Sequence, residues 1–185
     1  MKKLISIIIS LLTVCSICCF SGCEKQYEPE PQIKEGEFPF IVEYELNGQR
    51  YLIEDIVLCS FSGHDLSNPF PFIPYSRTWD SALESGDEEK CLIIEFPADS
   101  ESVLVKGRIN VESRIKLYYG SGGYYLGDRE DADKAPSINY VEKYVSGKNE
   151  TTVEISKLSF NQLEELFGIK VVRFDFRSPI KNSFE

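Results

Sequence analysis

The stretch that decides the fold is FIVEYELNGQRYLIEDIVLCSF, residues 40–61, in which two runs of strand-forming residues flank Asn47 and Gly48. Asn-Gly is the strongest short signal of a β-hairpin, because a type I′ turn needs positive φ at both central residues. A two-residue turn also fixes the register, with the pairs Glu45–Arg50, Tyr44–Tyr51 and Val42–Ile53. This register gathers opposite charges on one face and apolar groups on the other, so we predict an antiparallel hairpin.

Strand signals recur along the rest of the chain. The clearest is residues 110–119, where apolar and charged side chains alternate as in a half-buried antiparallel strand. Further strands are predicted at residues 90–96, 102–106, 124–126, 140–145, 151–155 and 169–176.

Two segments predict short helices. Ser159 followed by Gln162 fits a capping box, and Gly168 stands where a C-terminal cap belongs. Residues 78–85, before Gly86, show a weaker pattern of the same kind. Around eight strands with no alternating helices indicate an all-β fold, an antiparallel β-sandwich or barrel-like domain with one or two short helices. The alternative is an α+β fold with the helix after Ser159 packed on one sheet face.

The N-terminus has the layout of an export signal. Lys2 and Lys3 precede the run from Leu4 to Phe20, which holds no charged residue. A run of 17 residues is close to the shortest that can span a bilayer as a helix, so an uncleaved anchor is the alternative interpretation.

The next residues, Phe20-Ser21-Gly22-Cys23, resemble the lipobox of bacterial lipoproteins, although Phe20 departs from the aliphatic residue usual at its position. The resemblance implies that residues 1–22 are a signal peptide and that the Cys23 thiol receives a diacylglyceryl group before cleavage. Two acyl chains suffice for stable anchoring. It therefore implies a protein held at the cell membrane, on the extracytoplasmic face, by the lipid on Cys23.

Residues 24–37 hold five Glu, two Lys and two Pro, with only Tyr27 and Ile33 available for burial. Such a composition does not offset the entropy of folding, so residues 23–37 are predicted to be the lipidated cysteine and a disordered tether. Residues 38–185 have the length of one globular domain and are predicted to form a single β-rich unit.

Charge limits the choice of partners. Without residues 1–22 the chain carries 18 basic and 30 acidic side chains, a net charge of −12. Nucleic-acid binding and electrostatic adhesion to anionic lipid are therefore not expected.

One loop concentrates carboxylates, namely Asp128, Glu130, Asp131 and Asp133. Calcium takes six to eight oxygen ligands, so weak calcium binding is a hypothesis for this loop, although the spacing is not that of an EF-hand. A solvated acidic loop is the alternative, and no other cofactor is predicted.

Four tyrosines, Tyr118, Tyr119, Tyr124 and Tyr125, bracket a glycine-rich turn at residues 120–123. Tyrosines exposed beside such a turn suit contacts with a protein or carbohydrate ligand. The alternative is that they are aromatic cross-strand pairs that only stabilise a sheet.

Cys59 and Cys91 are the two thiols that remain once residues 1–22 are removed and Cys23 is lipidated. Outside the cytoplasm they are predicted to form a disulfide. The alternative is two buried free cysteines that act as small apolar residues.

A disulfide between Cys59 and Cys91 would close a loop that contains His64 and a proline-rich segment at residues 68–75. This segment is interpreted as a lid over one end of the core with Trp79 beneath it, or, if exposed, as a recognition surface.

No catalytic residues are predicted. His64 stands beside Asp65, but no nucleophile signature accompanies the pair. The predicted function is a non-catalytic binding or interaction module. The alternative is a surface hydrolase of envelope polysaccharide or peptide that uses a carboxylate pair.

Overall fold

The computed structural model describes residues 26–70, 72–145 and 151–185, and the chain divides into two units. The described part of the smaller unit is residues 26–29, 64–70 and 72–77, and that of the larger unit is residues 30–63, 78–145 and 151–185. These boundaries differ from the predicted single domain of residues 38–185. Apart from His64 and Arg77, the residues of both β-sheets belong to the larger unit.

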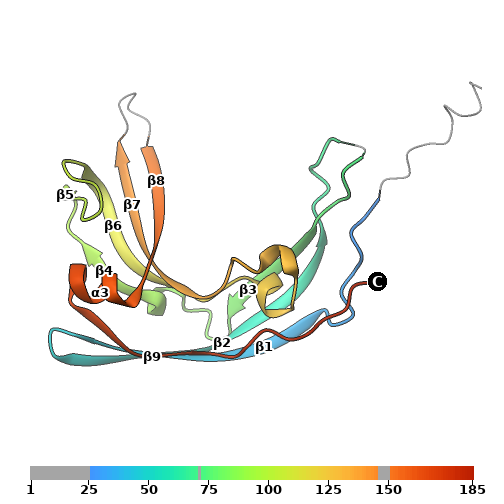
Figure 1. The fold of residues 1–185 in the computed structure, drawn as a ribbon, viewed down its shortest axis with the longest axis horizontal. Helices are drawn as coiled ribbons and strands as arrows, with labels where there is room; N and C mark the ends of the chain where they lie inside the picture. Colours follow the sequence, from blue (N-terminus) through green and yellow to red (C-terminus); the bar gives the residue numbers. More distant parts are fainter. Residues whose placement is uncertain (1–25, 71, 146–150) are drawn as a thin grey trace, which may run out of the picture. The chain divides into compact units, whose positions relative to one another are not determined.

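The predicted hairpin is confirmed in its strands, turn and register. β1 (Glu35–Leu46) and β2 (Gln49–His64) pair antiparallel, with Glu45 opposite Arg50 and Val42 opposite Ile53. The turn residues have the expected positive φ, 52° at Asn47 and 77° at Gly48. Figure 1 shows the two strands side by side.

The hairpin is the centre of a four-stranded sheet, here called the first sheet, with the order β3-β2-β1-β9. β9 (Ile169–Phe176) agrees with the prediction, but β3 (Arg77–Leu83) lies where a helix was predicted at residues 78–85. That prediction is wrong because hydrogen bonding to the neighbouring β2 outweighs a weak local helix signal.

The second sheet has the order β4-β6-β7-β8, with β5 paired to β6. Its strands are β4 (Leu92–Phe96), β5 (Ser100–Glu101), β6 (Ile109–Tyr118), β7 (Ser137–Val145) and β8 (Thr151–Leu158), and the 3-10 turn η1 (Glu88–Cys91) precedes β4. The strand predicted at residues 102–106 is absent from the described chain. The Ser102 hydroxyl accepts hydrogen bonds from the backbone N–H groups of Leu104 and Val105, which folds the segment into a turn.

Residues 124–126 are also not the predicted strand. They belong to α2 (Gly122–Tyr125) and its C-terminal cap, because the Ser121 hydroxyl accepts from the backbone N–H of Tyr124 and starts a helical turn. Only glycine fits at residue 122, since a Cβ there would lie 2.4 Å from the carbonyl oxygen of Asp80. A second 3-10 turn, η2 (Arg129–Asp131), follows.

The helix after Ser159 is confirmed as α3 (Phe160–Phe167). Ser159 and Gln162 form the predicted capping box, and Gly168 ends the helix with a φ of 66°. The Leu163 side chain is fully buried in the core. The helix connects β8 of the second sheet with β9 of the first (Figure 1).

One hydrophobic core is shared by residues of both sheets and both helices. Phe38 stacks on Tyr125 of α2 at 4.6 Å between ring centroids, and Phe167 of α3 contacts Phe96 and Tyr140 of the second sheet. Two antiparallel sheets around this core confirm the predicted all-β, sandwich-like class.

The segment predicted as a disordered tether is ordered over its described residues. Residues 35–37 belong to β1, and backbone hydrogen bonds join Glu30 and Gln32 to the C-terminal residues Glu185 and Ser183. The C-terminus, distant in the sequence, supplies these hydrogen-bond partners. Within residues 26–70, 72–145 and 151–185, no helix is long and apolar enough to cross a bilayer.

Candidate functional site

Alternate side chains of the first sheet point away from the core and form its outer face. In β1 the buried residues Phe38, Phe40 and Val42 alternate with side chains on the opposite side, as strand geometry requires. The outer face includes Glu35, Glu37 and Ile41 of β1, Leu52 and Leu58 of β2, and Asp80 of β3. Leu52 and Leu58 are exposed, so large apolar groups of this face are open to solvent.

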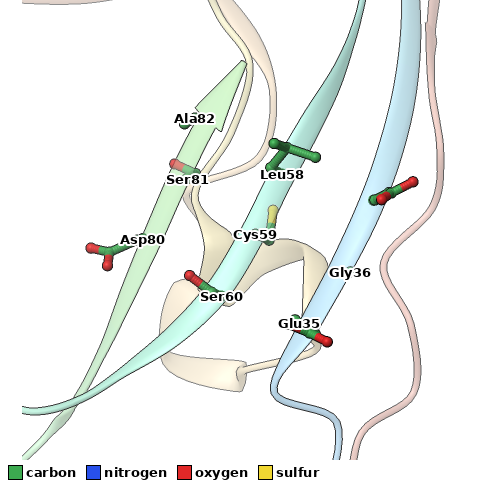
Figure 2. A pocket seen from close by; sticks show the side chains of 9 residues that line it. Glu35, Gly36, Leu58, Cys59, Ser60, Asp80, Ser81 and Ala82 are labelled. Carbon is green, nitrogen blue, oxygen red and sulfur yellow. The ribbon is translucent and has the colours of Figure 1, made fainter. Parts of the chain in front are cut away.

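A depression of about 580 Å³ crosses β1, β2 and β3 on this face (Figure 2). Its outward-facing side chains are Glu35 and Glu37 from β1, Leu58 and Ser60 from β2, and Asp80 and Ala82 from β3. Smaller depressions on the same face lie over Ile41 and Leu52 and over Pro39 and Arg177. The geometry is that of an open, shallow surface.

Charge is distributed unevenly over the outer face. Arg50 forms ion pairs with Glu43 and Glu45 at 3.1 and 2.9 Å, so the negative charge at one end of the sheet is partly compensated. Among the described residues, no ion pair involves the three depression carboxylates, Glu35, Glu37 and Asp80. The depression therefore keeps uncompensated negative charge around an exposed leucine.

The second sheet buries a polar network centred on Glu142, whose side chain is 1% exposed. The Arg108 guanidinium bridges Glu142 and Glu154, with N···O distances of 3.2 and 2.6 Å. It also lies over the Tyr144 ring, 4.0 Å from the centroid. The amide of Asn110 donates to Glu142 at 2.8 Å, while the carbonyl oxygen of this amide is buried without a partner among the described residues.

The network keeps Glu142 ionised. Burial alone raises the pKa of its carboxyl, but three hydrogen bonds and the charge of Arg108 more than offset this, so the pKa lies below its ordinary value. The donors of those bonds are Ser102, Asn110 and Tyr140. A general acid in glycoside hydrolysis needs a raised pKa, which is the opposite condition.

The four predicted ligand-binding tyrosines do not form a common exposed patch. Tyr125 is fully buried and donates its hydroxyl hydrogen to the carbonyl oxygen of Tyr119, and Tyr124 packs edge-on against it. The Tyr119 hydroxyl donates to Glu88 at 2.6 Å, and its ring stacks on Tyr118. Tyr118, Tyr119 and Tyr124 are half-buried, so the described contacts are those of packing residues.

The carboxylates of the predicted calcium loop diverge. Asp128 is buried and accepts from the Trp79 indole N–H at 3.0 Å. Asp131 is buried as well, and its two oxygens accept from Ser121 and Lys134. Glu130 and Asp133 are exposed, and no cluster of three or more metal-ligating side chains occurs in the part of the chain that the structure describes.

The predicted disulfide between Cys59 and Cys91 is not formed. Both cysteines are free, buried thiols within the hydrophobic core, so the alternative interpretation describes them correctly. Burial raises the pKa of Cys59 to about 12 and that of Cys91 to about 11. Both therefore act as small apolar core residues.

The proline-rich segment has large apolar side chains that are exposed. Phe70, Phe72 and Ile73 are 63%, 84% and 55% exposed, while Trp79 makes an edge contact with Phe61. His64 is a structural residue of the smaller unit, where its Nε2 lies 2.7 Å from the carbonyl oxygen of Glu28. The predicted lipid-anchor residue, Cys23, lies outside the described residues.

Sequence reasoning missed the depression, because Glu35 and Glu37 were assigned to a tether and Asp80 to a helix. A partial signal for β1 was present: Glu35, Glu37, Glu43 and Glu45 are all at odd positions, and the even positions from Phe38 to Tyr44 are apolar. No comparable signal marks Asp80, whose place on the face follows from the pairing of β3 with β2.

No family model, no curated protein and no solved structure matches the chain. What the protein does is therefore inferred from its own residues.

Proposed function

We propose that the protein is a lipid-anchored, extracytoplasmic interaction module without catalytic function. It binds a cationic, partly apolar segment of another protein on the outer face of its first sheet. The anchor is the lipid on Cys23, supported by the export-signal layout of residues 1–20 and the lipobox-like residues that follow.

The observation that carries the binding proposal is the depression at Glu35, Glu37 and Asp80. Three carboxylates without ion pairs among the described residues attract cationic groups, and the negative charge of the whole chain accelerates their approach. Leu58 and the neighbouring apolar side chains provide area for a hydrophobic contact. A protein segment that alternates basic and apolar side chains has this complementary chemistry.

Two observations favour this function over the alternatives. Arg108 joins the carboxylates of Glu142 and Glu154 and keeps Glu142 ionised, which disfavours their use as an acid and a nucleophile by a hydrolase. The predicted aromatic surface for carbohydrate is largely packed, since Tyr125 is buried and Tyr119 is bonded to Glu88.

The binding test uses the soluble chain of residues 24–185 and a short, fluorescently labelled peptide of alternating lysine and valine. Fluorescence anisotropy should detect binding that weakens as salt is added. Replacing two depression carboxylates, Glu35→Gln with Glu37→Gln, should weaken it roughly three- to tenfold, the effect of losing two exposed ion pairs.

The matched control removes the same two charges elsewhere, by Glu164→Gln with Glu165→Gln on the exposed side of α3. The proposal requires that this control bind the peptide almost as the unmodified chain does. Equal losses in both variants would mean that the peptide responds to net charge alone, and the outer face would not be the site.

A further inference from the structure

The smaller unit carries an apolar loop at its surface. Between residues 66 and 76 the sequence holds no charged residue. Four large apolar side chains of this segment are exposed, namely Leu66 at 63%, Phe70 at 63%, Phe72 at 84% and Ile73 at 55%. These four residues are called the apolar tip below. Single exposed apolar residues are ordinary, but four within eight positions concentrate exposed apolar area in one loop, as in segments that contact a membrane or a partner.

The base of this loop is fixed to residues 26–29. The backbone N–H of Glu28 donates to the carbonyl oxygen of Tyr75 at 3.1 Å, and the N–H of Tyr75 donates to that of Gln26 at 3.0 Å. The Tyr27 ring packs against both His64 and Tyr75, with ring centroids 5.2 and 5.3 Å apart.

Charged groups strengthen the same connection. The Arg77 guanidinium lies 3.4 Å from the Glu28 carboxylate and donates to the Pro29 carbonyl oxygen. The backbone N–H of Arg77 also donates to the Glu28 carboxylate at 2.9 Å. Both side chains are largely buried, 10% and 18% exposed, so the loop is held firmly to the first described residues of the chain.

Covalent reach then limits how far the loop lies from the lipid. Cys23 precedes Gln26 by three residues, and a chain extends at most about 3.6 Å per residue, so about 11 Å separates their Cα atoms at most. Gln26 is hydrogen-bonded to Tyr75, which follows Ile73 by two residues. A lipid on Cys23 would therefore keep the apolar tip close to the lipid headgroups, at a distance that a few residues of extended chain can span.

The backbone of the loop is suited to an apolar environment. Pro69 and Pro74 have no N–H group to satisfy. The N–H of Ser67 donates to the Asp65 carboxylate and that of Phe70 to the Asn68 side chain, at 2.8 and 3.0 Å. Because these donors are already bonded, burying the tip leaves fewer unpaired polar groups than burying an ordinary loop would.

We infer that the apolar tip inserts into the membrane interface beside the lipid anchor and is a second point of attachment for the protein. The inference rests on the proposed function, since it takes the lipid on Cys23 as the first attachment. Phe70 and Phe72 contribute most of the apolar area. Because the contacts described above join the loop to residues 26–29, insertion of the tip holds both segments of the smaller unit at the membrane.

The first experiment measures partition of the soluble chain of residues 24–185, which lacks the lipid, onto neutral phosphatidylcholine vesicles. Neutral lipid excludes the electrostatic contribution of an acidic chain. Replacing Phe70→Ser with Phe72→Ser should lower the partition coefficient roughly tenfold or more, because two exposed aromatic side chains no longer leave water.

The matched control is Val153→Ser with Ile155→Ser on β8, where the side chains are 57% and 63% exposed. This variant loses comparable exposed apolar groups away from residues 26–29 in the sequence and should partition as the unmodified chain does. No measurable partition of the unmodified chain, or equal losses in the two variants, would overturn the inference.

The second experiment uses the full, membrane-attached protein with Phe72→Trp, reconstituted in vesicles with brominated phosphatidylcholine. Emission from tryptophan at position 72 should shift to the blue and be quenched, while Ile155→Trp should behave like the unmodified protein with its native Trp79. An unquenched tryptophan at position 72 would exclude insertion and leave the tip to a protein partner. The mass of the N-terminal peptide reports separately whether Cys23 carries lipid, so a failed anchor and a failed insertion are distinguishable.

Discussion

Replacing Asp55 by asparagine should remove a buried charge that holds β2 to the segment before β4. The Asp55 side chain is 4% exposed and accepts hydrogen bonds from the Ser85 hydroxyl and from the Lys90 ammonium, the latter at 2.7 Å. The backbone N–H of Ile56 donates to the same carboxylate at 2.8 Å. An asparagine side chain has one acceptor oxygen and no charge, so it cannot keep all of these partners.

The size of the effect follows from the pKa of Asp55. Burial alone raises it, but the hydrogen bonds from Lys90, Ser85 and the backbone lower it from its ordinary 3.8 to about 2. A difference of this size between folded and unfolded chains corresponds to about 2 kcal/mol of stability. Since the folded pKa is the lower one, this stability is complete above the unfolded pKa and is lost as the pH falls from about 4 through about 2.

The assay is urea unfolding of the soluble chain and of Asp55→Asn between about pH 7 and about pH 2. The difference in unfolding free energy between the two chains should shrink by about 2 kcal/mol across this range. Asp175→Asn is the control, because Asp175 is exposed and its ion pair with Arg173 should contribute little at any pH. A difference for Asp55→Asn that stays constant down to pH 2 would refute the proposed charge contribution.

Three further predictions concern the anchor, the thiols and a close contact. Cys23→Ser should block processing, because the lipid is attached to the thiol before the signal is cut, and normal release of the mutant would disprove the lipoprotein assignment. In the soluble chain of residues 24–185, Cys59 and Cys91 should react with a thiol reagent only after denaturation, giving two thiols per chain without reduction, since both are buried and burial raises both pKa values. Gly123→Ala should cost about 1 to 3 kcal/mol in urea unfolding, because its Cβ would lie 2.4 Å from the Asp131 carboxylate.

The sequence was most informative where local chemistry determines the backbone. Asn47-Gly48 dictates its turn and register through positive φ, and Ser159, Gln162 and Gly168 define the ends of α3 through capping. These signals act between residues a few positions apart. They could be predicted because no distant partner is needed to satisfy them.

Predictions were wrong where residues far away in the sequence determine the local structure. Residues 77–83 form a strand, where a helix was predicted at residues 78–85, because β2 offers an edge for hydrogen bonding. The candidate site could not be predicted for the same reason, because Asp80 comes to line one depression with Glu35 and Glu37 only when β1, β2 and β3 pair. The acidic loop was misleading for a related reason. Its composition suggested carboxylates that are free to bind calcium, whereas the Asp128 carboxylate accepts a hydrogen bond from Trp79, 49 positions earlier.

The two proposed binding surfaces, the outer face of the first sheet and the apolar tip, differ in chemistry, so added salt should affect them differently. The outer face offers Glu35, Glu37 and Asp80 to a cationic segment, so binding there should weaken as the Debye length shortens. The apolar tip carries no charge, and its transfer from water to lipid is hydrophobic, so added salt should leave it unchanged or strengthen it. A protein retained on vesicles in high salt while it releases the basic peptide would therefore show that membrane contact and partner binding use different surfaces.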